Sequence, residues 1–556
     1  MLEKNQRYTA VITDLTFEGN GVCKIDGMTV FVPNTAVGDE VNLKIVKVMK
    51  SYAFGIAEEI VSVSKDRISP DCECFSKCGG CIFRHINYES ECKIKSDIVK
   101  NAFERIGGLT PEFDKFRGSV NISRYRNKAQ YPLAEVNGRA VYGFYAPRSH
   151  RVIPISDCRL QPEIFAEISN DILDYINQKK ISIYNEQSHT GIMRHIYIRQ
   201  GFHSKEIMVC IVVRKDISRE LKALIKILIN KYNDIKSIVM NVNSAKTNVI
   251  LGTKCITLWG NNFIYDVMCG NKIEISPLSF YQVNTEQAEL LYSVAEKYAQ
   301  LNENMYICDL YCGAGTIGLS MANKVRKLTG IEIVPQAIEN AKKNALQNNI
   351  NNADFFCGGA EIISDILNKN NDSPDVIILD PPRKGCDINT IFAAVKAAPE
   401  RIVMISCNPA TAARDCKLFD GLGYSAVKVC GVDLFPRTGH VETVVLLSHK
   451  KPDGHINVKV EFGEGEGKVP LDNIAKRAET YKPKERVTYK MIKEYIEAKY
   501  GFKVHTAYIA EVKRDLGLPM YDAPNAVEEL KQPRKHPTAE KVEAIKDALK
   551  YFGVCS

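Results

Sequence analysis

The chain has 556 residues, of which 45% are hydrophobic and 25% charged, a composition typical of folded globular proteins and not of disordered chains. Its 74 basic and 66 acidic side chains leave a net charge of +8, which is too small an excess to identify a polyanionic partner alone. At this length we expect three or four domains.

The first residues, MLEKNQRYTA, contain no apolar signal-peptide core, and no apolar run in the chain is long enough to cross a bilayer. We therefore expect a cytoplasmic protein without a membrane segment. Because that compartment is reducing, the 18 cysteines are not expected to form disulfides, and only those with informative spacing bear on function.

Residues 1–62 consist of short apolar segments separated by glycine turns, among them YTAVITDLTF, GMTVFVP and GDEVNLKIVKV. Short alternating segments at this density predict a small β-barrel. Lys44, Lys47 and Lys50 lie on one predicted strand and its exit. They favour nucleic-acid binding slightly over the alternative, a purely structural barrel.

Residues 63–290 remain β-rich and carry a cysteine cluster near their start. Basic and aromatic residues interleave in two stretches, 124–131 (RYRNKAQY) and 142–151 (YGFYAPRSHR). Aromatic rings stack on unpaired bases and arginines hold phosphates, so both stretches are candidates for RNA contacts. The alternative is a charged sheet face in water.

Residues 291–450 alternate between strand and helix patterns, which predicts a parallel α/β sheet. Residues 451–556 differ, because they are rich in lysine and glutamate, with helical patterns near 487–499, 505–516 and 538–551. The glycine-rich segment FGEGEGKVP precedes these helices and reads as a linker. The tail is thus expected to be a charged helical extension, and no motif assigns it a function.

A cofactor site is predicted in the segment MYICDLYCGAGTIGLS. Asp309 ends an apolar strand, and Gly313 and Gly315 open the following helix, where glycines let a ligand approach the backbone. Seventeen residues after Gly315, Glu332 lies on the next strand, at the offset of a carboxylate that binds ribose hydroxyls. The third glycine of a dinucleotide site is missing, which favours S-adenosylmethionine, a cofactor without a pyrophosphate.

The next strand, DVIILD, ends at Asp380, and Pro381, Pro382 and Arg383 follow it. Two prolines after an acidic strand end form a rigid turn beside the pocket, although a plain strand exit has the same pattern. Methyltransferases that act on exocyclic amines usually place an aromatic residue after the two prolines. Arg383 at this position argues against amine methylation.

A nucleophile and a base are predicted near the end of the same sheet. The strand RIVMIS ends at Cys407, so Asp309, Asp380 and Cys407 end three strands predicted to be neighbours. Carbon 5 of uracil becomes nucleophilic only after a thiolate adds to carbon 6, and this chemistry requires a cysteine. Glu442, just before an apolar strand, is a candidate general base for the carbon 5 proton. His440 is a weaker candidate, and structural roles for both residues are the alternative.

The motifs DLYCGAGTIGL, DPPRKG, SCNPAT and FPRTGHVE together resemble the RNA uracil-5-methyltransferase family, specifically its 23S ribosomal-RNA branch. The resemblance covers residues 1 to about 449. It implies an N-terminal TRAM domain, which is an OB-like RNA-binding barrel, and a Rossmann-like domain that uses S-adenosylmethionine. It assigns the nucleophile to Cys407, the base to Glu442, contacts with the target base to Phe280, and cofactor contacts to Gln282, Tyr311, Glu332 and Asp380.

The cysteine cluster has the spacing Cys72-x5-Cys78-x2-Cys81, with glycines that permit a tight turn. Three cysteines ligate poorly alone, and no second close pair of a zinc ribbon follows. The resemblance supplies Cys158 as the fourth ligand and a [4Fe–4S] cluster as the centre, with zinc as the main rival. Cys74 competes with Cys72 as first ligand. With four protein ligands the cluster is closed, so we expect it to be structural or to position RNA.

Three functions are weighed on these features. The first is a uracil-5-methyltransferase, in which the barrel and the cluster favour ribosomal RNA because the transfer-RNA branch typically lacks both. The second methylates an exocyclic amine, and the third is a non-catalytic iron–sulfur protein that binds RNA. We expect the first, acting as a monomer on ribosomal RNA, with a transfer-RNA uracil-5-methyltransferase as the alternative.

Overall fold

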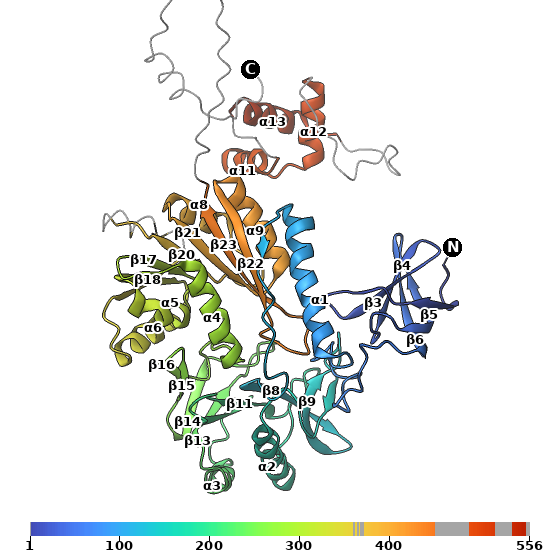
Figure 1. Cartoon of the computed structure of the whole chain (residues 1–556), viewed down its shortest axis with the longest axis vertical. Coiled ribbons are helices and arrows are strands. Elements are labelled where there is room, and N and C mark those ends of the chain that lie inside the picture. Colours follow the sequence, from blue (N-terminus) through green and yellow to red (C-terminus); the bar gives the residue numbers. More distant parts are fainter. Residues whose placement is uncertain are drawn as a thin grey trace, which may run out of the picture. The chain divides into compact units, whose positions relative to one another are not determined.

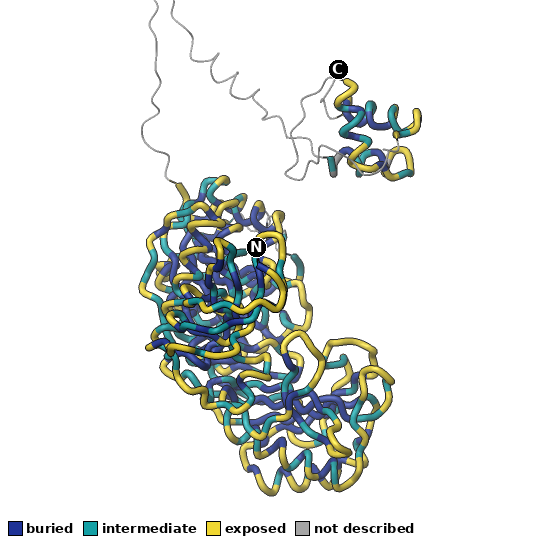
Figure 2. The backbone as a smooth tube through the Cα atoms, turned by 90° about the vertical axis from the view of Figure 1, so that its right-hand side faces the viewer, coloured by how far each residue is buried: buried dark blue, intermediate teal, exposed yellow. Residues whose placement is uncertain are grey.

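The computed structural model describes residues 2–359, 362–363, 366, 372–450, 489–516 and 536–551. It divides into two compact units, Met1–Asp453 and Gly454–Ser556, each described here by itself. The predicted linker at residues 462–470 lies outside the described residues. Figure 2 shows the buried residues in the interior of the first unit and the exposed residues around its outside.

The N-terminal part of the first unit is a six-stranded sheet in the order β1-β5-β6-β4-β3-β2. Alternate residues of β5, Val41, Leu43 and Ile45, are fully buried in its core, while Lys44 lies on the opposite face, as the two-residue strand period requires. Lys47 is exposed because the register of β5 against β6 shifts between Ile45 and Lys47. Its strands are β1 (Arg7–Val11), β2 (Asp14–Leu15), β3 (Asn20–Ile25), β4 (Met28–Pro33), β5 (Glu40–Val48) and β6 (Tyr52–Ser62).

A seven-stranded sheet in the order β10-β9-β8-β11-β12-β13-β14 forms the central part (Figure 1). Helices α2 (Glu163–Lys179) and α3 (Lys222–Lys231) share its hydrophobic core. The prediction of a β-rich region missed both helices, although Phe165, Ile168 and Ile172 are spaced for one helix face. The strands are β8 (Lys128–Val136), β9 (Arg139–Tyr145), β10 (Val152–Pro154), β11 (Met193–Gln200), β12 (Ile207–Val213), β13 (Ile235–Val242) and β14 (Lys254–Gly260).

The third part is an eight-stranded sheet in the order β19-β18-β17-β20-β21-β23-β22-β7. Strands β17 to β21 are parallel, as predicted, but β23 runs antiparallel to both β21 and β22, which the sequence analysis did not anticipate. The strands are β7 (Glu112–Phe113), β17 (Tyr306–Leu310), β18 (Lys327–Glu332), β19 (Ala353–Cys357), β20 (Val376–Leu379), β21 (Arg401–Ser406), β22 (Tyr424–Val432) and β23 (Glu442–His449).

Helices cover both faces of this sheet, as in a doubly wound α/β fold. Because side chains alternate along a strand, Val403 of β21 joins the core beneath α4 (Thr285–Ala299), α5 (Thr316–Met321) and α6 (Pro335–Gln347). Its neighbour Met404 joins the opposite core, beneath α1 (Tyr88–Asn101), α8 (Ile388–Lys396) and α9 (Pro409–Gly421).

The segment that follows the cysteine cluster belongs to this α/β core and not to the central sheet. Helix α1 and the π-helical turn η1 (Ala102–Gly107) pack against α9, and β7 pairs with β22 as the last strand of the sheet. The hairpin of β15 (Ile264–Met268) and β16 (Asn271–Ile275) packs into the other core of the same sheet. The region predicted as a separate domain, 63–290, therefore contributes elements to both sheets.

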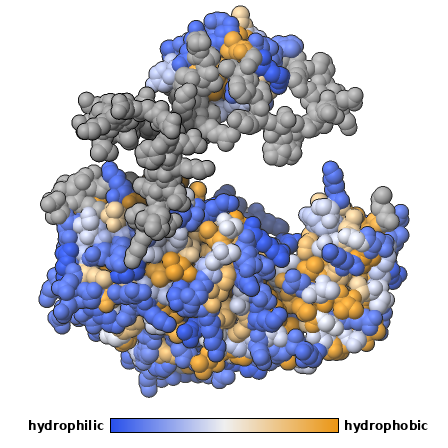
Figure 3. Space-filling view, turned by 45° about the horizontal axis from the view of Figure 1, so that its top comes forward, coloured by the Kyte–Doolittle hydropathy of each residue, from blue (hydrophilic) through white to orange (hydrophobic). Residues whose placement is uncertain are grey.

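Among its described residues, the second unit contains three helices near the predicted places, α11 (Tyr489–Tyr500), α12 (Thr506–Asp515) and α13 (Ala539–Tyr551). They share a small apolar core of their own, in which Ile496, Ile509 and Ile545 are fully buried. No helix among the described residues is both long enough and apolar enough to span a membrane. In the view of Figure 3 the described surface is largely hydrophilic, with hydrophobic residues in small scattered patches.

We expect a chain that ends at Lys450 to keep the fold of the first unit. Its last hydrogen bond, from the Lys450 N–H to the Gly423 carbonyl at 2.8 Å, survives this truncation, and the tail has a separate core. Thermal unfolding and binding of S-adenosylmethionine by the shortened chain test this expectation. An insoluble chain, or one that no longer binds S-adenosylmethionine, would show that the tail is part of the core.

Candidate active site

Four polar side chains predicted from the sequence lie at one edge of the eight-stranded sheet. Strands β18, β17, β20 and β21 are adjacent and parallel, so their carboxyl ends meet there. Glu332 ends β18, Asp309 lies one residue before the end of β17, Asp380 directly follows β20, and Cys407 directly follows β21. The strand order turns back between β17 and β20, which is where open α/β sheets bind their ligands.

The antiparallel strand β23 brings Glu442 to the same edge. Ser406, the last residue of β21, pairs with Thr443, the second residue of β23. Because the two strands run in opposite directions, Cys407 and Glu442 are the next residues at the same end of the pair. The sequence placed Glu442 before an apolar strand, and the direction of that strand puts it beside the thiol.

Burial and mutual repulsion shape the charges of these two groups. Burial and the neighbouring Asp380 raise the pKa of Glu442 to about 8, and the Arg383 guanidinium opposes this shift. Burial and the nearby Glu442 raise the pKa of the Cys407 thiol above its ordinary value, which Arg383 again opposes. The Arg383 backbone is held by Asn408 and Thr411 at the start of α9, at 3.3 and 3.4 Å from its carbonyl oxygen. The Arg383 guanidinium therefore favours the ionised form of both the Cys407 thiol and the Glu442 carboxyl group.

The loop after β17 leaves open space beside two carboxylates. Gly315 has a φ of +80°, which favours glycine, and a Cβ atom added to Gly313 would meet no atom within 4 Å. Glu332 accepts hydrogen bonds from the N–H groups of Gly313 at 3.2 Å and Val334 at 2.9 Å. Asp309 accepts from the Gly318 N–H at 2.9 Å, and burial raises its pKa to about 8.

The other predicted cofactor residues also lie near this edge. Tyr311 follows β17 with a φ of +67°, and its hydroxyl lies 2.9 Å from the Thr390 hydroxyl. Burial raises the pKa of the Tyr292 hydroxyl. The nearby Asp380 carboxylate raises this pKa further, and a hydrogen bond with the Gln282 side chain lowers it. Phe280, two residues before Gln282, is 67% exposed and leaves its ring free to stack on a base.

A cavity of about 1230 Å³ opens onto Cys407. Arg383, Phe435 and His440 line it, as does the loop Leu15–Glu18 of the N-terminal sheet. Five further cysteines line the same cavity, namely Cys72, Cys74, Cys78, Cys81 and Cys158. The nucleophile and the predicted cluster ligands therefore face one common space.

The cluster cysteines interact with one another. Burial, together with the neighbouring Cys81 and Cys78, raises the pKa of Cys158 to about 12. Cys81 likewise interacts with Cys72. Within the described residues, no three His, Cys, Asp or Glu side chains stand close enough to hold a single metal ion.

Two further cysteines differ in their surroundings. Cys74 interacts with Cys72 and lies 3.5 Å from the Pro154 carbonyl, so it stays a competitor for the first ligand position. Cys92 lies on α1, where its pKa responds to burial, Tyr88 and Asp433 and not to the cluster thiols. Cys92 does not line the cavity that the five other cysteines share.

His440 is not suited to act as the base. Burial and the Arg383 charge lower its pKa to about 4, so its neutral ring is a weak base. Its Nε2 atom lies 3.4 Å from Arg383 Nη2, which makes the ring a hydrogen-bond partner of that guanidinium. Glu442, whose buried carboxyl group has a pKa raised to about 8, is the stronger base once it is ionised.

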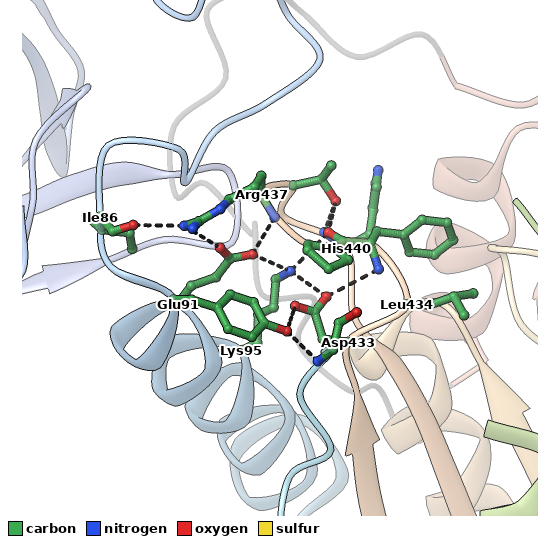
Figure 4. Close-up of polar contacts among 12 residues, drawn as sticks. Ile86, Glu91, Lys95, Asp433, Leu434, Arg437 and His440 are labelled. Atoms are coloured by element: carbon green, nitrogen blue, oxygen red, sulfur yellow. Dashed lines mark hydrogen bonds and ion pairs between the residues drawn. The ribbon is translucent and has the colours of Figure 1, made fainter. Parts of the chain in front are cut away.

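The loop before β23 is fixed to α1 by a buried ionic network that the sequence analysis did not find (Figure 4). We call residues 433–441 the base loop. Lys95 Nζ donates to Glu91 Oε1 at 2.8 Å, to Asp433 Oδ1 at 2.7 Å and to the Phe435 carbonyl at 3.1 Å. The Lys95, Glu91 and Asp433 side chains are all 0% exposed. Glu91 and Lys95 are a visible i, i+4 pair, but Asp433 lies 338 residues away.

Arg437 connects this network to the cysteine segment. Its backbone N–H donates to Glu91 Oε1 at 2.6 Å, and its Nη1 donates to the Ile86 carbonyl at 2.8 Å. Its carbonyl accepts from the N–H groups of Ile82 and Phe83, which directly follow Cys81. The base loop is therefore held between α1 and the segment that carries the cysteines.

We expect Lys95→Met to destabilise the protein by roughly 3–5 kcal/mol, because it leaves the buried Glu91 and Asp433 carboxylates without this cation. Lys93→Met is the matched control, since Lys93 lies on the same helix in an exposed pair with Asp97 that contributes about 0–1 kcal/mol. Urea unfolding of both variants measures the difference. Equal losses would mean that the buried network does not stabilise the fold.

Comparison with known proteins identifies the family. A profile of the tRNA (Uracil-5-)-methyltransferase family matches residues 87–450, and a TRAM domain profile matches residues 2–57. An uncharacterized RNA methyltransferase of Clostridium tetani is 41% identical over 448 residues, covering 81% of this chain and 97% of its own length. Another from Staphylococcus epidermidis is 40% identical over 454 residues, covering 81% and 99%.

Among solved structures, the tRNA (uracil-54, C5)-methyltransferase of Pyrococcus abyssi, in complex with S-adenosyl-L-homocysteine, is similar to this chain with a TM-score of 0.62. The two are 27% identical, and the match covers 79% of this chain and all of that structure. The predicted family and TRAM domain are thus confirmed, whereas the ribosomal-RNA branch remains a prediction. With an N-terminal TRAM domain and a methyltransferase match over most of its length, this chain belongs to the tRNA (Uracil-5-)-methyltransferase family of RNA methyltransferases.

Proposed function

We propose that this protein transfers a methyl group from S-adenosylmethionine to carbon 5 of a uracil in ribosomal RNA, with Cys407 as nucleophile and Glu442 as base. The pairing of Ser406 with Thr443 carries this proposal, because it sets the thiol and the carboxylate at the ends of adjacent strands. An amine methyltransferase or a vestigial domain gives no reason for that juxtaposition.

In the proposed reaction the Cys407 thiolate adds to carbon 6 of the uracil, and the electron pair moves to carbon 5 as an enolate. Carbon 5 then takes the methyl group, and S-adenosylhomocysteine is the leaving group. Glu442 accepts the proton from carbon 5, and the carbon–sulfur bond to Cys407 breaks to release 5-methyluridine. Arg383 stabilises the thiolate at the start of this sequence.

The residues at the sheet edge fit the methyl donor. Asp309 Oδ1 is buried without a hydrogen-bond partner among the described residues, and the Gly313 turn leaves room for a ligand. We assign Glu332 to the ribose hydroxyls, and Gln282, Tyr311 and Asp380 to the remaining cofactor contacts. The Pyrococcus abyssi relative was solved with S-adenosyl-L-homocysteine, which supports this choice of cofactor.

We further propose that Cys72, Cys78, Cys81 and Cys158 hold a [4Fe–4S] cluster with a structural or RNA-positioning role. In such a cluster each thiolate binds a different iron, so the sulfurs surround a space without converging on one point. The common cavity and the mutual interactions of these thiols support this arrangement over a single zinc ion. The buried Arg84, which interacts with Cys81 and has unpartnered Nε and Nη2 atoms within the described part, supplies a cation for the anionic centre.

Anaerobically purified protein should absorb visible light broadly and contain about four irons per chain, because thiolate-to-iron charge transfer colours such clusters. Cys158→Ser should lose both signals, since it removes a ligand. Cys92→Ser is the matched control and should keep them, since Cys92 does not interact with the cluster thiols. Colourless protein with stoichiometric zinc would overturn the assignment.

The choice of ribosomal RNA over transfer RNA rests on the combined TRAM domain and cysteine cluster. The similar Pyrococcus abyssi enzyme is named for transfer RNA, so transfer RNA is the competing substrate. Mapping 5-methyluridine in all stable RNAs, with and without the gene, decides between them. Loss of 5-methyluridine from ribosomal RNA without the gene supports the proposal, and its loss from transfer RNA alone contradicts it. No loss from any RNA would favour a non-catalytic RNA-binding protein.

A further inference from the structure

A second, smaller pocket of about 170 Å³ lies on the central sheet next to the active-site cavity. Arg126, Phe144 and Gln161 line both spaces, so the pocket and the cavity are adjacent. The pocket has no role in the chemistry proposed above, and it adjoins the cavity that opens onto Cys407.

The pocket owes its polar lining to strand alternation. Ala129 and Tyr131 of β8 point into the hydrophobic core, so Lys128 and Gln130 point to the opposite face. On the neighbouring strand β11, His195 pairs with Pro132 and reaches the same pocket. Phe144 on β9 also borders the pocket, but it shares its face of the strand with Tyr142 and packs against Tyr131 of the hydrophobic core.

The polar side chains of this pocket have no partners within the protein. Among the described residues, none of the five makes a side-chain hydrogen bond or ion pair: Arg126, Lys128, Gln130, Gln161 and His195. Gln161 is only 2% exposed and His195 only 7%, and their Oε1 and Nδ1 atoms are buried and unpaired. Unpaired buried polar atoms are costly unless a ligand or water satisfies them, so their convergence on one pocket indicates a ligand.

The charges define the class of that ligand. Burial lowers the pKa of His195 to about 4, so its neutral ring offers one hydrogen-bond donor and one acceptor. Burial and the neighbouring Arg199 and Arg126 lower the pKa of Lys128 to about 8, and a nearby anion relieves this repulsion. A ligand with a planar, hydrogen-bonding ring and a phosphate meets all of these requirements.

We propose that this pocket binds one unpaired nucleotide of the substrate RNA, a neighbour of the target uridine. Gln130, Gln161 and His195 hydrogen-bond its base, and Arg126 and Lys128 contact its phosphate. This inference rests on the proposed function, since it takes an RNA at Cys407 as given. The pocket would therefore recognise a second nucleotide, so that the enzyme selects RNAs by the sequence next to the methylated uridine.

Binding of unmethylated stable RNA, measured by filter retention with the full-length protein, tests the pocket without requiring turnover. Lys128→Ala and Gln130→Ala, made separately, should each weaken binding about tenfold, while binding of S-adenosylmethionine stays unchanged. Neither side chain has a partner whose loss would disturb the fold. Lys254→Ala is the matched control, because it removes an exposed lysine from the edge strand β14 of the same sheet, and it should bind as wild type. Equal binding by wild type and both pocket variants would overturn the proposal.

An RNA fragment around the mapped 5-methyluridine then shows whether a base occupies the pocket. Removing single bases next to the target should reveal one position that weakens wild-type binding about tenfold but causes no further loss in Gln130→Ala. Full additivity at every position would mean that no base is bound there. Methylation of the intact fragment by wild type is measured in parallel, so a failure of the proposed function is seen separately from a failure of the pocket.

Discussion

Cys407→Ala should abolish methylation while leaving binding of both substrates intact. Without the thiolate no enolate forms at carbon 5, so the uracil cannot attack the methyl group, and we expect a loss of about 10⁴-fold or more in kcat. The side chain is half-buried beside the cavity and makes no hydrogen bond among the described residues, so its removal leaves no partner stranded. Transfer of labelled methyl groups to RNA measures the loss of methylation. Separate binding assays with RNA and with S-adenosylmethionine show whether the variant still binds both substrates.

The covalent step itself can be seen with 5-fluorouridine in the substrate RNA. Wild-type enzyme should add to carbon 6, methylate carbon 5 and then stop, because fluorine cannot leave as a cation. The protein–RNA adduct should appear on a denaturing gel with wild type and never with Cys407→Ala. Cys416→Ala is a suitable control, since Cys416 on α9 is fully buried in the core and does not line the cavity at Cys407. Turnover by Cys407→Ala would refute the mechanism.

The candidate site was predictable because its residues follow a regular sheet. Parallel strands end at a common edge, so Asp309, Asp380 and Cys407 were expected to be neighbours before any coordinates, and the strand order confirms it. The glycine turn and Glu332 follow from the same rule. The spacing of hydrophobic residues along the sequence predicts where strands lie, but it does not predict the direction in which a strand runs in the sheet. The prediction of a purely parallel sheet was therefore incomplete, and the antiparallel β23 is what places Glu442 beside Cys407.

The rest of the architecture depends on contacts distant in sequence. Lys95 appears as an ordinary lysine on an amphipathic helix, and only folding reveals that its partner is Asp433. Strand β7 has two residues, too few for any strand pattern, yet it extends the sheet by pairing with β22. Gly439 looks like a flexible loop residue, but an added Cβ atom would lie 2.2 Å from the Phe17 carbonyl of the N-terminal sheet. Such close approaches between remote segments leave no local signal.

Glu442→Gln should fail at a later step than Cys407→Ala. The thiolate still adds and the methyl group is still transferred, but the proton on carbon 5 has no acceptor. Methylated RNA should therefore stay attached to the protein, with release slowed about 10²–10⁴-fold. A denaturing gel detects the attached RNA, and digestion to nucleosides shows whether it carries the methyl group. Normal release of product by Glu442→Gln would rule out this carboxylate as the base.

The pH dependence of release gives a second test of Glu442. Only the ionised carboxylate accepts a proton, and burial beside Asp380 raises its pKa to about 8. Release by wild type should therefore slow as the pH falls below about 8, approaching a tenfold loss per pH unit, and should level off above it. Overall turnover is unsuitable for this measurement, because the Cys407 thiol also titrates with a raised pKa. Decay of the preformed adduct isolates the proton transfer, and in Glu442→Gln that slow decay should lose its dependence on pH in this range.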